Sequence, residues 1–244
     1  MKKSLLLSVV LFLAPSYRAK AADTMTADTK EFLMGAVVKS NSWVMNRKKN
    51  TETFNGDVSF DNSRYSLKAD NAVYYRNIFF WTLKGNVYSR RGFDDGSAVE
   101  SVCDRAEYRE KPEQIDMFRG RSPVKMKYIH KDGRVLHGLT DKVHADNIAN
   151  FMIFDGHFRL STDNLFIESA TGRYNKSEET FTFKDSPDPK KSEGLPLSAG
   201  TVREYDFAVR AETITLYKDS RNIVLKNKVS GWIKDPKYSE MKIK

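Results

Sequence analysis

The sequence FNGDVSF at residues 54–60, YSLKADNAVY at residues 65–74 and WTLKGNV at residues 81–87 decides the fold. Apolar and polar residues alternate through all three segments, which is typical of strands that bury one face. The later parts of the chain repeat the same pattern. The sequence therefore predicts an all-β protein built from repeated hairpins, with about twelve to sixteen strands of ordinary length.

The repeats become visible when the chain is aligned on Asp70. Four further copies align on Asp104, Asp146, Ala170 and Glu212, and a small residue precedes each aligned position. The spacing between copies is uneven, whereas a solenoid has rungs of fixed length. This pattern favours antiparallel hairpins joined by loops of variable length.

Each copy changes the parity of its apolar face at the aligned position. Tyr65 and Leu67 precede Asp70, and Ala72 and Tyr74 follow it, which a strand of period two can accommodate only with an extra residue. We therefore expect a β-bulge or sharp bend there, capped by the acid. Because the acids recur as parts of a repeat, they predict structure rather than paired-carboxylate catalysis.

The N-terminus is typical of a secretory signal. Lys2 and Lys3 precede an apolar run at residues 5–14, and a small-x-small tripeptide ends at residue 21. The run is about half the length of a membrane span, so we expect cleavage rather than anchoring. The formal net charge is +9, and removing residues 1–21 with their four basic residues leaves +5. A mildly basic exported protein suits an anionic partner without naming one.

The rest of the chain reads as one domain over residues 22–236, followed by a C-terminal tail at residues 237–244. A proline-rich stretch at residues 186–200 is expected to be an exposed loop inside that domain. The single cysteine, Cys103, occupies the small-residue position of its repeat and excludes an internal disulfide.

No motif for catalysis is visible. The four histidines lack the spacing of metal ligands, and the sequence holds neither a glycine-rich phosphate loop nor a Ser-His-Asp pattern. We expect a protein that is not an enzyme, with no cofactor, no metal and no nucleic-acid partner.

Several short motifs resemble those of a known family. FNGDV at 54–58, the Ala69-Asp70-x-Ala72-x-Tyr74 unit, LKGNV at 83–87 and GRSPVKM at 120–126 are similar to segments of the OstA-like (LptA/LptC) family of lipopolysaccharide-transport proteins. The resemblance spans residues 40–233. It implies a V-shaped antiparallel β-jellyroll whose apolar groove receives the acyl chains of lipopolysaccharide in the periplasm.

The resemblance also implies partners. They are an inner-membrane export complex and an outer-membrane translocon reached through edge strands, together with head-to-tail self-association. The chain departs from the family in an extra repeat at residues 205–232 and in lacking a long N-terminal anchor. An LptC-like component held at the inner membrane, a non-lipid β-scaffold and a glycan-binding protein therefore remain alternatives.

Two sets of residues are candidate sites. The inward apolar positions are expected to line the groove, although an ordinary closed core would show the same pattern. They are Val58, Phe60, Tyr65, Leu67, Tyr74, Trp81, Leu83, Val87, Phe118, Val143, Phe154, Phe158, Leu165, Ile167 and Phe181. The candidate contacts for a lipid headgroup are four basic residues: Arg119, Arg121, Lys125 and Lys127. The alternative interpretation is that they form an ordinary solvent-exposed strand face.

Overall fold

The structure is a computed structural model that describes residues 37–243, except 62–64, 94–95, 147, 203, 219, 221 and 235–240. The signal sequence expected at residues 1–21 lies outside the described residues. No helix in the described part of the chain has the length and apolar character needed to span a membrane.

Within the described residues, nineteen strands form one antiparallel sheet, which confirms the all-β fold, and one short 3₁₀-helix accompanies them. The count exceeds the predicted range because several hairpin arms are split into short strands. The strands are β1 (Val37–Lys39), β2 (Ser42–Asn46), β3 (Thr51–Asp61), β4 (Tyr65–Tyr75), β5 (Phe80–Gly92), β6 (Ala98–Arg109), β7 (Gln114–Phe118), β8 (Val124–Ile129), β9 (Val135–Thr140), β10 (Lys142–Asp146), β11 (Phe151–Ser161), β12 (Leu165–Asn175), β13 (Thr180–Lys184), β14 (Leu197–Val202), β15 (Tyr205–Arg210), β16 (Thr213–Tyr217), β17 (Ile223–Lys226), β18 (Ser230–Lys234) and β19 (Met241–Ile243), and the 3₁₀-helix is Pro189–Lys191.

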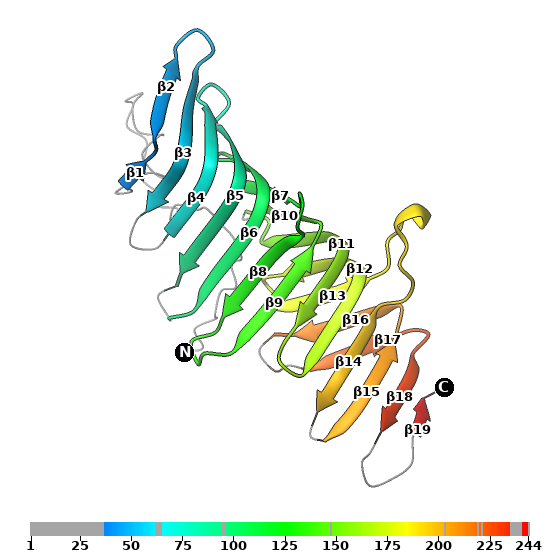
Figure 1. Cartoon of the computed structure of the whole chain (residues 1–244). Coiled ribbons are helices and arrows are strands. Elements are labelled where there is room, and N and C mark those ends of the chain that lie inside the picture. The colour runs from blue at the N-terminus through cyan, green and yellow to red at the C-terminus, as the bar shows by residue number, and fades with distance from the viewer. Residues whose placement is uncertain are drawn as a thin grey trace.

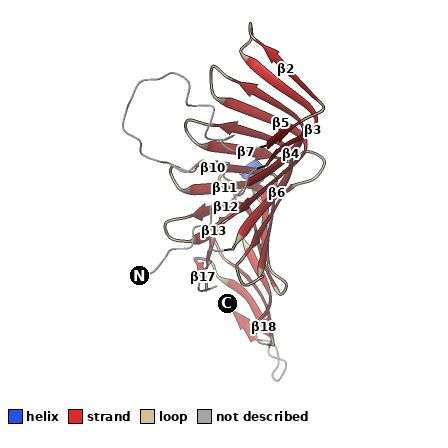
Figure 2. Cartoon of the chain, turned by 90° about the vertical axis from the view of Figure 1, so that its left-hand side faces the viewer, coloured by secondary structure: helices blue, strands red, loops and turns tan. Residues whose placement is uncertain are grey.

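The sheet is folded along its length into two walls (Figure 2). Six long strands, β3, β4, β5, β6, β11 and β12, run through both walls. The first wall also holds β2, β7, β10, β13, β16 and β17, and the second holds β1, β8, β9, β14, β15, β18 and β19. Successive strands step from β1 and β2 at one end to β18 and β19 at the other (Figure 1). The result is the V-shaped antiparallel architecture that the sequence predicts.

The walls meet at a line of β-bulges, here called the bend. The strand register shifts at residues 55/58, 68/71, 84/87 and 155/158. The extra residues lie mainly on the glycine-containing strands, as in Gly85-Asn86, where both residues have positive φ. Asp70 packs opposite, and a Cβ on Gly85 would lie 2.2 Å from its Oδ2. The expected bend at Asp70 is confirmed, and glycine is needed because no side chain fits there.

One aligned position of the repeat was wrong. Asp146 ends β10, where its carboxylate accepts a hydrogen bond from the backbone N–H of Ala149. The acid at the bend in this repeat is Asp141, which lies fifteen residues before Gly156 as Asp70 lies fifteen before Gly85. A Cβ on Gly156 would meet Asp141 at 2.6 Å. The prediction chose the wrong acid because Ala145-Asp146 matches the repeat's pattern of a small residue followed by an acid, whereas Thr140-Asp141 does not.

Two boundaries also differ from expectation. Leu197–Val202, expected inside a loop, forms β14 and pairs with both β12 and β15. Met241–Ile243, within the expected tail, pairs with β18 as β19. In both cases a neighbouring strand edge offers backbone donors and acceptors, which outweigh weak local patterning.

The two walls enclose one apolar core. Tyr74 and Trp81 stack in the first wall with ring centroids 4.4 Å apart. Further along, Phe158 stacks on Phe154 at 4.1 Å and on Phe183 at 5.1 Å. Stacked rings add to the free energy gained from burial of their apolar surface.

Candidate lipid-binding interior and the outer bend

Most of the proposed groove residues line this interior. Their side chains are buried, with exposed fractions of 4% or less. They are Val58, Phe60, Leu67, Tyr74, Trp81, Leu83, Val87, Val143, Phe154, Phe158, Ile167 and Phe181. They come from both walls. The parity of the buried residues changes at the bend in β4, β6 and β12, whereas the bulge keeps it unchanged in β3, β5 and β11, so the apolar face stays inward on both sides.

Three residues of the set differ. Phe118 does not face the interior: Ile115 and Met117 are the buried residues of β7, and the Phe118 ring lies beneath the guanidinium of Arg105 and near the ammonium of Lys142. The adjacent apolar pair at 117 and 118 leaves the parity of this strand ambiguous in the sequence. Leu165 is only half-buried, and the Tyr65 side chain lies outside the described residues.

The interior is filled by its own side chains. A small apolar pocket of about 20 Å³ lies between the walls, bordered by Met126 and Tyr128 on one side and by Phe154 and Phe181 on the other. This volume is about enough for one water molecule. An acyl chain could enter only if the walls move apart.

A polar contact crosses between the walls. Lys218 follows β16 in the first wall, its side chain is 4% exposed, and its Nζ lies 3.0 Å from a carboxylate oxygen of Glu179. The same Nζ lies 5.6 Å from the ring centre of Tyr128 in the second wall. A buried ammonium is tolerated because it is paired, and its contact with Tyr128 helps hold the walls together.

Two buried polar groups of the first wall share one carboxylate. Trp81 Nε1 donates to Glu110 at 2.8 Å, and the Tyr74 hydroxyl donates to the same residue at 3.4 Å. Burial and the charge of Glu110 raise the pKa of Tyr74 well above its usual range. The hydroxyl therefore stays a donor, and the wall keeps its polar groups satisfied.

Apolar side chains of the inner face are at least partly exposed at both ends of the sheet. At the β2 end, Trp43 pairs with the inward-facing Phe54 and is 55% exposed. At the opposite end, Ile223 and Leu225 of the end strand β17 pair with the inward-facing Leu216 and Ile214 and are only half-buried. The interior surface thus continues to the two ends of the molecule.

The candidate headgroup residues lie on the outer face. Arg119 and Arg121 are exposed in the β7–β8 connection at the bend, and Lys125 and Lys127 alternate with buried residues of β8. The Arg119 guanidinium pairs with Asp141, and the Arg121 backbone N–H donates to Asp104 at 2.6 Å. A role in binding a headgroup stays a prediction.

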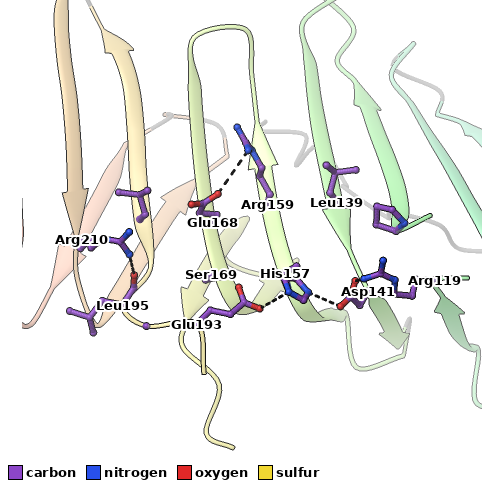
Figure 3. A pocket seen from close by; sticks show the side chains of 13 residues that line it. Arg119, Leu139, Asp141, His157, Arg159, Glu168, Ser169, Glu193, Leu195 and Arg210 are labelled. Carbon is purple, nitrogen blue, oxygen red and sulfur yellow. Dashed lines mark hydrogen bonds and ion pairs between the residues drawn. The ribbon is translucent and has the colours of Figure 1, made fainter. Parts of the chain in front are cut away.

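A polar pocket of about 400 Å³ adjoins Arg119 on the outside of the bend (Figure 3). Five ionic or hydrogen-bonded pairs border it: Arg119 with Asp141, His157 with both Asp141 and Glu193, Arg159 with Glu168, and Arg210 with the carbonyl of Leu195. The sequence analysis did not single out this pocket, because its residues come from four separate repeats and a loop.

The chemistry of the remaining groups is structural. Burial is the main cause that raises the pKa of the Cys103 thiol to about 12, so it carries no thiolate at neutral pH. Among the described residues, no group of three or more His, Cys, Asp and Glu side chains is arranged to hold a metal ion.

Comparisons with known proteins add only distant likenesses. No protein family and no curated protein matches the sequence. Among solved structures, the chain matches LptH, the LptA homologous periplasmic component of the lipopolysaccharide transport device from Pseudomonas aeruginosa. The two are 10% identical with a TM-score of 0.32, over 69% of this chain and 94% of that one. This score is too low to establish a common fold, so the fold assignment rests on the chain's own strand pairing.

Sequence reasoning missed much of the second wall's inner face. Several residues that were not predicted as groove residues are also buried, with exposed fractions of 8% or less. They are Val99, Met126, Tyr128, Leu160 and the first-wall residue Phe183. The alternation of Val124, Met126 and Tyr128 was sufficient to predict the inner face of β8. The sequence analysis used it instead to interpret the basic residues between them.

Proposed function

We propose that the protein is a periplasmic carrier that binds the acyl chains of lipopolysaccharide, or a similar glycolipid, between its two walls. The observation that carries the proposal is the continuous apolar inner face of a bent sheet, which reaches both ends of the molecule through Trp43 on β2 and through Ile223 and Leu225 on β17. The OstA-like motifs of the sequence add support, because they imply the same ligand and compartment.

Binding requires the walls to separate at the bend. Each methylene moved from water into the interior contributes about 0.8 kcal/mol, so several acyl chains gain enough free energy to offset the contacts between walls that are lost. The contact between Lys218 and Tyr128 must break during this opening. No energy source is part of this mechanism, so direction must come from partner proteins.

Head-to-tail self-association extends the same surface. The first wall leaves Trp43 exposed at the β2 end and leaves Ile223 and Leu225 only half-buried at the β17 end. Stacking of copies through the end strands would cover both ends and join their interiors. The export complex and the translocon implied by the family resemblance would attach at the same edges.

A binding measurement tests the carrier role. The purified protein is mixed with lipopolysaccharide or with the same glycan after chemical deacylation, and complexes are detected by native mass spectrometry. We expect a complex with the acylated form alone. Equal binding of both forms would favour a glycan-binding protein, and no binding would remove the carrier proposal.

A locked variant tests the need for opening. Cysteines at positions 128 and 218, in opposite walls, are joined by a short bis-maleimide, which the buried Cys103 should not react with. We expect the link to prevent lipid binding. The matched control joins cysteines at the paired positions 125 and 139 of the second wall, and its binding should not change. Equal binding by the locked protein would contradict the opening step.

A β-scaffold is the second candidate, and the filled interior favours it. With a pocket of about 20 Å³, the resting structure needs no ligand to complete its core. A scaffold would assemble through its edges and fail to bind the acylated ligand. N-terminal sequencing of the exported protein separates a free periplasmic carrier, beginning after residue 21, from an anchored LptC-like component.

A further inference from the structure

Residues 185–196, here called the strap, connect the first wall to the second by a detour over the outside of the bend. The other connections between the walls at the bend are shorter: β9 to β10 needs only Asp141, and β7 to β8 needs residues 119–123. The strap holds its own shape, because the Asp185 carboxylate accepts hydrogen bonds from the Ser192 hydroxyl and from the backbone N–H of Glu193. It therefore acts as one body that can be attached or released.

The strap is attached to the bend chiefly through Glu193. Its carboxylate accepts a hydrogen bond from the backbone N–H of His157 at 3.1 Å, and it lies 3.7 Å from Nε2 of the same residue. The other imidazole nitrogen, Nδ1, lies 2.8 Å from Oδ2 of Asp141 (Figure 3). One imidazole ring thus lies between two carboxylates, one on the body of the sheet and one on the strap.

The other bends show what is different here. In the β5 bulge, Asn86 occupies the position of His157 and donates to Asp70 at 3.0 Å. Near β17, Lys228 pairs with Glu212 in the same way. Histidine is the only side chain among these whose charge ordinarily changes between pH 5 and pH 8. Among these three bends, only His157 lies next to a second carboxylate, and that carboxylate, Glu193, belongs to a separate segment of the chain.

We propose that the strap is a pH-sensitive latch, in which the imidazolium of His157 holds Glu193 against the bend and loss of its proton releases the strap. Two cavities of about 400 and 420 Å³ flank the strap. Release would join them and uncover a charged surface on the outside of the bend. The latch concerns this outer surface alone and does not depend on what the interior binds.

The surrounding charges set the direction of the switch. The hydrogen bond to Asp141 and the charge of Glu193 raise the pKa of His157, against smaller opposite effects of burial and of Arg119. The stabilisation of docking by the imidazolium is therefore fully present below the ordinary histidine pKa near 6.5 and is lost as the pH rises through the raised value. The further charged groups around the strap are Lys142, Asp155, Arg159, Glu168, Lys190, Lys191 and Arg210.

Several attachments do not involve the imidazole. Glu193 accepts from the backbone N–H of His157 at 3.1 Å, and Lys191 Nζ lies 3.5 Å from Asp155. Arg210 donates to the carbonyl of Leu195 at 2.8 Å, and the Ala211 N–H donates to the carbonyl of Pro196 at 3.2 Å. They keep the strap near the sheet when the imidazole loses its proton. The latch therefore changes how often the strap opens rather than removing it entirely.

Hydrogen exchange of the strap amides tests the latch. Protection factors, corrected for the intrinsic effect of pH, are measured between about pH 5.5 and about pH 8.5. We expect protection in residues 185–196 to fall roughly three- to fivefold as His157 loses its proton, the scale of an exposed ion pair. The amides around the Asn86–Asp70 bulge serve as an internal control and should not change.

Two variants make the test specific. His157→Asn copies the residue at the β5 bulge, keeps a donor for Asp141 and does not titrate, so its strap protection should be independent of pH. Glu193→Gln removes the second carboxylate and should hold protection near the high-pH value throughout. The same pH dependence in the wild type and in His157→Asn, or none in the wild type, would overturn the proposal.

Discussion

Single residues show both what the sequence reveals and what it hides. Leu67 could be placed in the interior from alternation alone, because the polar residues Ser66 and Lys68 flank it, and Trp81 could be placed because Leu83 and Val87 continue its parity. Phe118 could not, because an apolar neighbour precedes it and the covering groups, Arg105 and Lys142, come from other strands. The link between His157 and Glu193 was equally hidden, since 36 residues separate them.

Asp116 illustrates a polar residue that stabilises the outer face of the first wall. Its carboxylate is buried, and it accepts from Arg109 at 2.8 Å and lies 3.1 Å from Nδ1 of His144 and 3.7 Å from Lys142. Burial alone would raise the pKa of Asp116, but these hydrogen bonds and charges hold it below its ordinary value. The group therefore stabilises the fold above about pH 4, and this contribution is lost as the pH falls further.

We predict that Asp116→Asn lowers the free energy of unfolding by about 1–3 kcal/mol at neutral pH, because Arg109 loses a charged partner. The loss should shrink as the pH falls below about 4, where the wild type becomes protonated too. Urea denaturation over this range checks both effects, with Asp163→Asn in an exposed loop as the control. A loss that does not depend on pH would contradict the assignment.

At the scale of elements, the repeated bend could be predicted from the sequence. The residue at which each strand bends could be predicted for only some of the repeats. The parity change around Asp70 requires an extra residue, and the structure supplies it as Gly85-Asn86 on the neighbouring strand. The third bend was misplaced from Asp141 to Asp146, because only the pairing of β10 with β7 and β11 fixes which acid reaches the bulge. Long-range pairing is not encoded in a local pattern.

Gly85 provides the test of the bend. A side chain there would adopt a φ of 73° and place its Cβ 2.2 Å from Asp70 Oδ2. We predict that Gly85→Ala destabilises the protein by about 1–3 kcal/mol, through backbone strain and displacement of Asp70. Gly92→Ala, in the same strand with no atom within 4 Å of the new Cβ, should be close to neutral in the same denaturation assay. Equal effects of the two would argue against a strained bend.

At the scale of the whole molecule, the V follows from six long strands that all bend at one level. Alternation predicts two apolar faces, and the bend turns them toward each other. The alternation does not determine whether the interior is open or filled, because a closed core and a ligand groove need the same apolar residues. The structure shows the filled state.

The exposed ends predict head-to-tail association, a contact between two different surfaces. We expect sedimentation velocity to show oligomers that grow with protein concentration. Trp43→Glu places a charge on the exposed inner face of β2 and should reduce association. Ile78→Glu, at a residue that is 61% exposed in the turn between β4 and β5, should leave it unchanged. Oligomers that persist in Trp43→Glu would place the contact elsewhere.

The most direct test of the carrier is photo-crosslinking in cells that make lipopolysaccharide. A photoreactive residue replaces Leu67 or Phe158 on the inner face, or Lys68, Phe118 or Arg173 on the outer face, and each adduct is probed for lipopolysaccharide. We predict lipid adducts at the two inner positions and none at the three outer ones. Inner positions that link only to protein, or to nothing, would contradict lipid binding between the walls and leave the scaffold as the better account.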